Sequence, residues 1–480
     1  MAKDPMLKFV SKQQAYPEKR AAKLRAEDFA EIASRYAPQA AEEQASRCSQ
    51  CGVPYCSVHC PLHNHIPDWL RLTAEGRLRE AYELSNLTST MPEICGRICP
   101  QDRLCEGNCV IEFSGHDAVT IGSVEKYITD TAWEEGWVEP IDVGPARGQS
   151  VGIIGGGPGG LTTAEYLRVA GYEVHVYDRY DRMGGLLTYG IPGFKLEKDI
   201  VTRRVKRLED SGIIFHANFE VGRDASLDEL RAKHDTVLIA TGVYKARDIK
   251  TPGIGLDGIA PALDYLTASN RKGFGDAVPA FDSGALNAEG KDVVVIGGGD
   301  TAMDCVRTAI RQGAKSVKCL YRRDRENMPG SQREVANAEE EGVEFVWLSG
   351  PKSFGGDDKV SQVHVSKMRL GAPDASGRRA PESDPQGDFT VNADLVITAL
   401  GFEAEDLPVL FGTPDLNVTR WGTIRVDHTT MMTNLDGVFA IGDIVRGASL
   451  VVWAIRDGRD VTQYMHSWLQ AKAKAAKVAA

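Results

Sequence analysis

The pattern of apolar and polar residues changes near residue 150 and divides the chain into two parts. In residues 1–149 apolar positions recur near helical spacing and are separated by many loops. Helix is predicted for 18–45, which is rich in Ala, Glu, Lys and Arg, and for 67–87, which breaks near Gly76 into one or two short helices. After a polar linker at 144–150, short apolar runs alternate with helical patterns, which is typical of an α/β sheet.

The second part of the chain contains one βαβ pattern twice. In the first copy an apolar run at 151–154 leads into a glycine loop, a helical pattern at 161–171 and a second strand. The second copy begins at residue 292 with DVVVIGGGD and continues through a helix to a strand at 316–323. This repeat predicts an α/β fold with two Rossmann-like dinucleotide-binding units, preceded by an α-helical region.

Two further segments have patterns of their own. Between residues 343 and 400, three strand-like runs surround a polar loop at 371–388, which predicts a small antiparallel meander attached to the second unit. The last ten residues, AKAKAAKVAA, have low complexity and predict a frayed helix or a disordered end.

Composition narrows the class of protein. The 480 residues are 42% hydrophobic and 26% charged, which is ordinary for a folded soluble protein. A net charge of −11 argues against non-specific nucleic-acid binding. The N-terminal sequence has no apolar signal-peptide core, and no run of 18 apolar residues occurs. We therefore expect a cytoplasmic protein that binds neither nucleic acid nor membranes.

The first glycine loop fits a dinucleotide site. Gly155, Gly157 and Gly160 form G-x-G-x-x-G directly after a strand, where such loops bring the backbone close to a pyrophosphate. Asp178 ends the next strand, 23 residues after Gly155, and a carboxylate there can bind a ribose hydroxyl.

The second glycine loop predicts a preference for NADP(H). Gly297 and Gly299 are followed by Ala302 in the third position, which is a permitted variant. The next strand ends in Arg322 and Arg323 instead of an acid, and guanidinium groups bind a 2′-phosphate well. The alternative is a solvated basic pair at a strand end. Asp300 and Thr301 at the start of the helix are further candidate cofactor contacts.

Eight of the ten cysteines lie between residues 48 and 109, in two runs of four. Zinc and iron–sulfur clusters are the serious candidates for eight thiols, and disulfides are disfavoured in a cytoplasmic chain. The first run closes with Cys-Pro, which is a ferredoxin feature, so we favour iron–sulfur. The remaining thiols, Cys305 and Cys319, are expected to be inert and buried on a helix and a strand.

Three short motifs, at 240–242, 398–402 and 440–443, resemble those of two-dinucleotide flavoprotein reductases. This resemblance implies FAD on the first unit and NADPH on the second, which is inserted into the first. It also implies that Asp443 hydrogen-bonds the flavin's ribityl chain. The other positions expected at these cofactors are Gly185, Thr241, Gly242, Gly401 and Gly442. The implied domains are 1–149, then 150–247 with 408–480 for FAD, and 248–407 for NADPH.

The whole chain, with CSQCGVPYCSVHCP and PEICGRICPQDRLCEGNC as its most specific pieces, resembles the small subunits of NADPH-dependent glutamate synthases. The N-terminal half of dihydropyrimidine dehydrogenase is similar. The family implies two 4Fe-4S clusters and a large partner subunit that makes L-glutamate from L-glutamine and 2-oxoglutarate. Hydride transfer to a flavin needs no side-chain acid or base, so no catalytic residue is expected.

By analogy with two-cluster ferredoxins, the last cysteine of each run is expected to ligate the other cluster. The first predicted set is Cys48, Cys51, Cys56 and Cys109, and the second is Cys60, Cys95, Cys99 and Cys105. Two other functions remain open. One is a different NAD(P)H:ferredoxin-type or electron-bifurcating subunit, and the other is a zinc-stabilised docking module without enzymatic activity.

Overall fold

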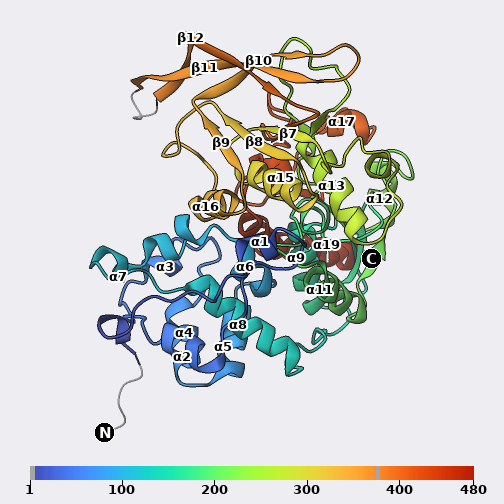
Figure 1. Cartoon of the computed structure of the whole chain (residues 1–480). Coiled ribbons are helices and arrows are strands. Elements are labelled where there is room, and N and C mark those ends of the chain that lie inside the picture. The colour runs from blue at the N-terminus through green and yellow to red at the C-terminus, as the bar shows by residue number, and fades with distance from the viewer. Residues whose placement is uncertain (1–5, 375–378, 480) are drawn as a thin grey trace.

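The computed structural model describes residues 6–374 and 379–479, and its centre is a five-stranded parallel sheet (Figure 1). The strands are β1 (Ser150–Ile154), β2 (Glu173–Tyr177), β3 (Ile214–His216), β4 (Thr236–Ile239) and β15 (Val438–Ala440). Their order in the sheet is β15-β4-β1-β2-β3. Every neighbouring pair is parallel, which explains why the central strands are apolar runs instead of alternating patterns. We call this sheet and its helices the first unit.

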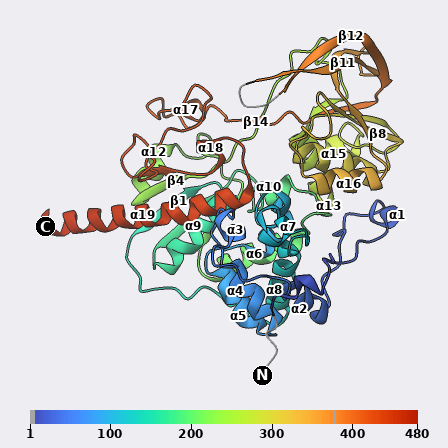
Figure 2. The ribbon, with the colours of Figure 1, turned by 90° about the vertical axis from the view of Figure 1, so that its left-hand side faces the viewer.

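Helices cover the first sheet and bury its apolar faces. Those of the first unit are α9 (Pro158–Val169), α10 (Leu186–Tyr189), α11 (Lys198–Asp210), α12 (Leu227–Lys233), α17 (Leu407–Leu410), α18 (Asp443–Arg446) and α19 (Val451–Ala479). α19 packs along α9 and continues to the last described residue as one long helix (Figure 2), so the low-complexity end is helical up to Ala479. Val151 and Ile153 of β1 share a core with Leu161 of α9 and Ile455 of α19.

A second parallel sheet repeats the same architecture. Its strands are β6 (Ile259–Pro261), β7 (Asp292–Ile296), β8 (Ser316–Tyr321), β9 (Glu344–Trp347) and β13 (Leu395–Thr398), in the order β6-β13-β7-β8-β9. Its helices are α13 (Ala262–Gly273), α14 (Pro279–Asp282), α15 (Asp300–Arg311) and α16 (Gln332–Glu340). We call this the second unit; the two copies of the βαβ pattern are confirmed.

The predicted antiparallel meander is present, but the predicted polar loop within it is wrong. β10 (Ser349–Gly355), β11 (Gln362–Pro373) and β12 (Arg379–Asn392) form a three-stranded sheet at the edge of the second unit. Most of the polar stretch at 371–388 belongs to β11 and β12, and residues 375–378 lie outside the described part. An antiparallel ribbon with exposed faces accepts polar side chains, so low hydrophobicity did not indicate a loop here.

The chain crosses between the two units twice. It leaves the first unit after β4 and returns to form β15, so the second sheet lies inside the sequence of the first. The two crossings pair with each other as β5 (Lys245–Ala246) and β14 (Phe402–Glu403), with Ala246 opposite Phe402. The covalent connection between the units is therefore one short two-stranded ribbon.

The cysteine-rich region before residue 150 is built from short helices and loops. These are η1 (Lys8–Val10), α1 (Ala22–Arg25), α2 (Pro38–Ala45), α3 (Tyr55–Val58), α4 (Ile66–Ala74), α5 (Leu78–Asn86), α6 (Pro92–Ile98), η2 (Gln101–Arg103), η3 (Glu106–Asn108), α7 (Val110–Phe113) and α8 (Ile121–Glu134). The pair of helices broken near Gly76 is confirmed. The long helix predicted over 18–45 is wrong, because only α1 and α2 are helical there.

The segment that departs from the helix prediction forms a closed loop. Residues 18–34 fold back on themselves, with the Arg20 N–H donating to the Ile32 carbonyl at 2.9 Å and the Ser34 N–H to the Glu18 carbonyl at 3.0 Å. We call residues 18–34 the N-terminal loop; its α1 lies beside α16 of the second unit in both views (Figures 1 and 2). Within the described residues, none of the helices combines the length and apolar character needed to cross a membrane.

Candidate cofactor and cluster sites

The first glycine loop is shaped for close backbone approach. Gly155 has a φ of +108°, and a Cβ there would lie 2.4 Å from the Ala240 carbonyl oxygen. A Cβ at Gly160 would lie 2.0 Å from the Gly155 oxygen, so both positions require glycine. Gly157 caps α9 and has open space where a Cβ would be. The first turn of α9 therefore presents free N–H groups to an open cradle that fits a pyrophosphate.

Asp178 lies at the end of β2, beside this loop. Its Oδ2 accepts from the Gly156 N–H at 2.7 Å, and its Oδ1 accepts from the Tyr180 N–H at 2.9 Å. Burial raises the pKa of Asp178, and these two N–H groups oppose the rise. Asp178 lines a cavity together with Gly155, Thr241 and Tyr244. Each carboxylate oxygen keeps a second lone pair, so Asp178 can still accept a ribose hydroxyl.

The other residues predicted at the flavin follow the ends of neighbouring strands. Thr241 and Gly242 follow β4, while Gly442 and Asp443 follow β15, so these residues lie at the same sheet edge as the glycine loop. Asp443 begins α18 and accepts from the Ser449 hydroxyl at 2.7 Å. A Cβ at Gly185 would lie 3.0 Å from the Gly157 Cα, which places the segment 183–192 against the loop.

The second glycine loop has the same geometry. Gly297 has a φ of +152°, and a Cβ there would lie 2.3 Å from the Ala399 carbonyl oxygen. Gly299 caps α15, with open space beside it. Thr301 is half-buried in the first turn of α15, and Gly401 follows β13 with a φ of +97°. The cradle at the start of α15 thus fits a second pyrophosphate.

The two arginines after β8 differ in their surroundings. Arg322 is exposed, whereas Arg323 is half-buried. The Nε of Arg323 is buried and has no hydrogen-bond partner within the described residues. A buried donor without a partner is costly, and an anion such as a 2′-phosphate would satisfy it. This observation favours nucleotide binding over a merely solvated basic pair.

Arg103, which no sequence motif indicated, extends from the cysteine-rich region to the second glycine loop. The Arg103 guanidinium contacts the Asp300 carboxylate, with Nη2 and Oδ2 3.1 Å apart, and donates to the Pro329 carbonyl at 2.7 Å. The other Asp300 oxygen accepts from the Ser331 N–H at 2.9 Å. No local motif singled out Arg103, because its partner lies 197 residues away.

The four cysteines of the first predicted set surround one cavity. The residues lining it include Cys48, Cys51, Cys56 and Cys109. Pro67, Leu70 and Ile121 add apolar walls. Burial raises the pKa of Cys48 to about 11 and that of Cys56 to about 12. Buried thiolates need a cationic partner, which an iron–sulfur cluster supplies, so the donor set fits such a cluster.

The cysteines of the second predicted set lie together on the other side of the region. Cys95 is on α6, and Cys99 caps its end with an N–H to the Cys95 carbonyl at 3.2 Å. Cys60 interacts electrostatically with Cys95, and Cys105 with Cys60. Glu125 of α8, which the sequence did not single out, faces this group; burial raises its pKa well above the usual range.

The two sets differ in their distance from the first unit. Cys95 belongs to the same core as Val151 and Leu161 of the first unit, with Cys60 and Cys99 packed against it. Close by, the Thr90 and Thr162 hydroxyl oxygens are 2.8 Å apart. Cys48 and Cys109 belong instead to the core of the cysteine-rich region. The second set therefore lies between the first unit and the first set.

Within residues 6–374 and 379–479, no three His, Cys, Asp or Glu side chains are close enough to share one ion. Cys305 of α15 and Cys319 of β8 are buried, as the sequence predicted.

Comparison with known families agrees with this division of the chain. Residues 25–137 match the model for dihydropyrimidine dehydrogenase domain II, 4Fe-4S cluster. Residues 149–458 match the model for pyridine nucleotide-disulphide oxidoreductases. The expected fold class, an iron–sulfur region followed by a two-dinucleotide reductase fold, is confirmed.

Relatives are similar over nearly the full length. The glutamate synthase (NADPH) small chain of Azospirillum brasilense is 68% identical over 475 residues, which cover 99% of this chain and 98% of the relative. The corresponding small chain of Escherichia coli K12 is 45% identical, covering 96% and 98%. Among solved structures, Mycobacterium tuberculosis FprA in complex with NADPH has a TM-score of 0.58 at 21% identity, covering 69% of this chain and 86% of FprA.

Proposed function

Because this chain belongs to the family of glutamate synthase (NADPH) small chains, we propose that it oxidises NADPH and delivers the electrons to a large subunit. That subunit would form L-glutamate from L-glutamine and 2-oxoglutarate. The observation that carries this proposal is the order of sites in space. Two dinucleotide cradles lie at the edges of two sheets, and the second cysteine set lies between the first unit and the first set.

The two units would each hold one of the nucleotide cofactors. The first unit would hold FAD through the loop at Gly155 and through Asp178, and the second unit would hold NADPH through the loop at Gly297 and Arg323. When bound, the flavin accepts a hydride and the clusters carry single electrons. The protein's own part is to hold the nicotinamide and flavin rings in register, for which positioning alone is effective. The unit boundaries given above from the sequence are part of this proposal.

An exposed apolar surface beside the first cysteine set supports a protein partner. Its members are Val53, Tyr55, Val58, Val110 and Phe113. Phe113 is 79% exposed, and Tyr55 and Val110 also line the cavity of the first set. Tyr55 and Val110 thus lie together at one cavity, and clusters of exposed apolar side chains are typical of interfaces. We therefore place the large subunit over α3 and α7, beside the cavity that the first cysteine set lines.

The test is an anaerobic titration of the isolated chain with NADPH, combined with analysis of iron, sulfide and flavin. We expect one FAD, two clusters and bleaching of both chromophores, and then glutamate formation when the large subunit is added. Reduction of ferredoxin without glutamate formation would replace this proposal with a ferredoxin-linked reductase. A colourless chain that contains zinc and no iron would replace it with a docking module.

A matched pair of surface variants tests the partner's position. Phe113→Ser should weaken association with the large subunit while leaving NADPH-dependent flavin reduction unchanged. Val409→Ser, at an equally exposed residue of α17 far from the cysteines, is the control. Equal weakening by both variants, or by neither, would move the interface elsewhere.

A further inference from the structure

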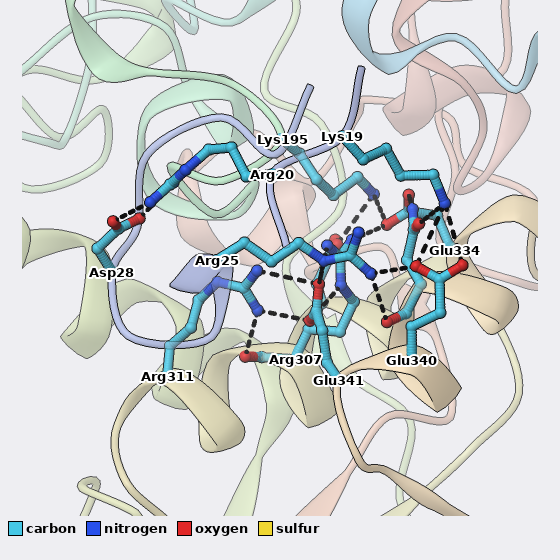
Figure 3. Close-up of polar contacts among 12 residues, drawn as sticks. Lys19, Arg20, Arg25, Asp28, Lys195, Arg307, Arg311, Glu334, Glu340 and Glu341 are labelled. Atoms are coloured by element: carbon cyan, nitrogen blue, oxygen red, sulfur yellow. Dashed lines mark hydrogen bonds and ion pairs between the residues drawn. The ribbon is translucent and has the colours of Figure 1, made fainter. Parts of the chain in front are cut away.

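The N-terminal loop makes a buried contact with the second unit through Arg25. Arg25 of this loop is only 1% exposed, and its Nε lies 3.0 Å from Glu341 Oε1. Its Nη2 pairs with Glu340 Oε2 and lies 3.5 Å from the Asn337 carbonyl. Figure 3 shows this guanidinium pointing into the carboxylates of the α16 end, more than 300 residues away in sequence. A long-range contact of this kind brings the loop onto α16.

Glu341 is shared by three arginines. Besides Arg25, it accepts from Arg307 at 2.8 and 2.9 Å and from Arg311 at 2.6 and 3.1 Å. The side chains of these four residues are at most 1% exposed. Arg307 and Arg311 both belong to α15, the helix that begins at the second glycine loop. Arg25 is thus linked through one carboxylate to the helix that carries the NADPH cradle.

The first unit contributes to the same network. Lys195 Nζ lies 2.9 Å from Asp304 Oδ1 of α15 and 3.7 Å from Glu334 Oε2 of α16. Next to it, the Phe194 ring lies under the guanidinium groups of Arg307 and Arg311, 4.4 and 3.9 Å from their carbons. Lys195 and Phe194 follow the segment 183–192 that lies against the first glycine loop.

Positively charged side chains from outside the second unit balance the carboxylates of this network. The second unit itself supplies four carboxylates to the network and only two arginines. The carboxylates are Asp304, Glu334, Glu340 and Glu341. Lys195 of the first unit and Arg25 of the N-terminal loop supply the two missing positive charges, and Lys19 of the same loop adds a further, partly exposed pair with Glu340. Buried carboxylates without such partners are strongly unfavourable.

The N-terminal loop also touches the first unit directly. The Phe29 and Phe194 ring centroids are 6.3 Å apart, and a Cβ on Gly193 would lie 2.9 Å from the Phe29 carbonyl oxygen. The N-terminal loop therefore contacts both units where they meet.

The covalent link between the units is only the ribbon of β5 and β14. They also touch through the partly exposed ion pair of Arg182 with Asp276 and the buried Asn270 side chain, which donates to the Tyr189 carbonyl at 2.9 Å.

From these contacts we propose that the N-terminal loop is a clamp, with Arg25 as a positioning residue that holds α15 and its nucleotide cradle in register with the first unit. This inference rests on the proposed function, because register matters for hydride transfer between the two bound nucleotides. Arg25 touches neither cradle, so its loss should slow the transfer step without weakening NADPH binding. Orientation of two reactants has large effects on rate, so a slowing of about tenfold or more is expected.

The experiment compares Arg25→Ala with Arg20→Ala in the full-length holoprotein. Arg20 pairs with Asp28 inside the same loop, and among the described residues no hydrogen bond or ion pair joins its side chain to α15 or α16, so it is the matched control. Two readouts are needed. Stopped-flow reduction by NADPH separates the limiting rate from the apparent Kd, and hydrogen–deuterium exchange follows residues 300–311 and 332–341.

For Arg25→Ala we expect the limiting rate to fall about tenfold, with the apparent Kd for NADPH unchanged and exchange increased in both segments. Arg25→Lys keeps the charge and should recover part of the rate, and Glu340→Gln should show a weaker form of the same effect. Arg20→Ala should behave as the unaltered chain does.

Three outcomes would overturn the clamp. They are increased exchange with an unchanged limiting rate, a raised Kd with an unchanged limiting rate, and equal effects of Arg20→Ala. If NADPH fails to reduce the unaltered chain, the proposed function fails instead. The exchange comparison then still decides whether Arg25 holds α15, since it does not depend on turnover.

Discussion

Arg103 of the cysteine-rich region and Asp300 of the second glycine loop form an ion pair, with Nη2 and Oδ2 3.1 Å apart. Asp300 is the first residue of α15, where a nucleotide pyrophosphate would bind, so its carboxylate repels that ligand unless a cation lies beside it. The cysteine-rich region therefore contributes to the electrostatics of the NADPH cradle.

The first prediction follows from this pair. Arg103→Ala should raise the KM for NADPH about threefold at low salt, with a smaller effect at high salt, because the pair is partly exposed and therefore screened. In an Asp300→Asn background the same change should have no effect. An undiminished loss in that background would mean that Arg103 acts on the nucleotide itself. Arg79→Ala, which removes an exposed pair on α5, is the control.

The second prediction concerns the choice between NADPH and NADH. Arg323→Ala should raise the KM for NADPH about 10- to 100-fold, because a charge-assisted hydrogen bond is worth about 1.5–3 kcal/mol. The KM for NADH should stay nearly constant, since NADH lacks the 2′-phosphate. Steady-state kinetics with both nucleotides measures the ratio. A parallel loss for both nucleotides would assign Arg323 to the fold instead of to specificity.

The third prediction separates the two cysteine sets. Cys56→Ala should remove one cluster and about half of the iron and sulfide, and Cys99→Ala should remove the other. Electron paramagnetic resonance of the reduced chain should then show a different remaining signal in each variant. Cys305→Ala changes a buried thiol outside both sets and should leave the iron content intact. Loss of the same signal in both variants would refute the division into sets.

The fourth prediction concerns acid stability of the first unit. Lys233 donates to the Tyr177 hydroxyl at 2.9 Å, and the same hydroxyl is in hydrogen-bond contact with His234 Nε2, 2.8 Å away. The positive charge of Lys233 beside this pair disfavours a second positive charge on the His234 ring. Burial, followed by the nearby His175 and Lys233, lowers the pKa of His234 to about 4.

A depressed histidine pKa means that the unfolded chain binds the proton more readily. Stability is thus lost as pH falls from about 6.5 toward about 4, by about 1 kcal/mol at pH 5.5 for this residue. His234→Gln, which does not titrate, should remove that part of the decline. Thermal unfolding of both chains near pH 7.5 and 5.5 measures the difference; identical pH dependences would contradict the prediction.

Local features of this fold were readable from the sequence. The glycine loops and the two cysteine runs depend on residues only a few positions apart, so their strands, helices and spacing were visible directly. The cavity lined by Cys48, Cys51, Cys56 and Cys109 joins residues from both runs, and only an analogy to ferredoxins suggested that grouping.

Other features depend on distant partners. The segment 18–45 has good helix formers, but helix propensity is worth less than about 1 kcal/mol per residue, and tertiary contacts such as that of Arg25 with Glu341 lie outside its scope. Neither Arg25 nor Lys195 has a local signature, because their carboxylate partners become neighbours only when the N-terminal loop and the first unit pack on the second unit. The same holds for Arg103.

The pairing of Ala246 with Phe402 has a consequence for how such a protein can be rearranged. Opposed residues of an antiparallel pair have Cα atoms only about 5 Å apart, a gap that a two-residue turn closes. A chain with such a turn in place of residues 247–401 would keep all five strands of the first sheet in order. The second unit is thus an insertion with a single covalent junction, and a module exchanged there by recombination must also supply partners for Arg25 and Lys195.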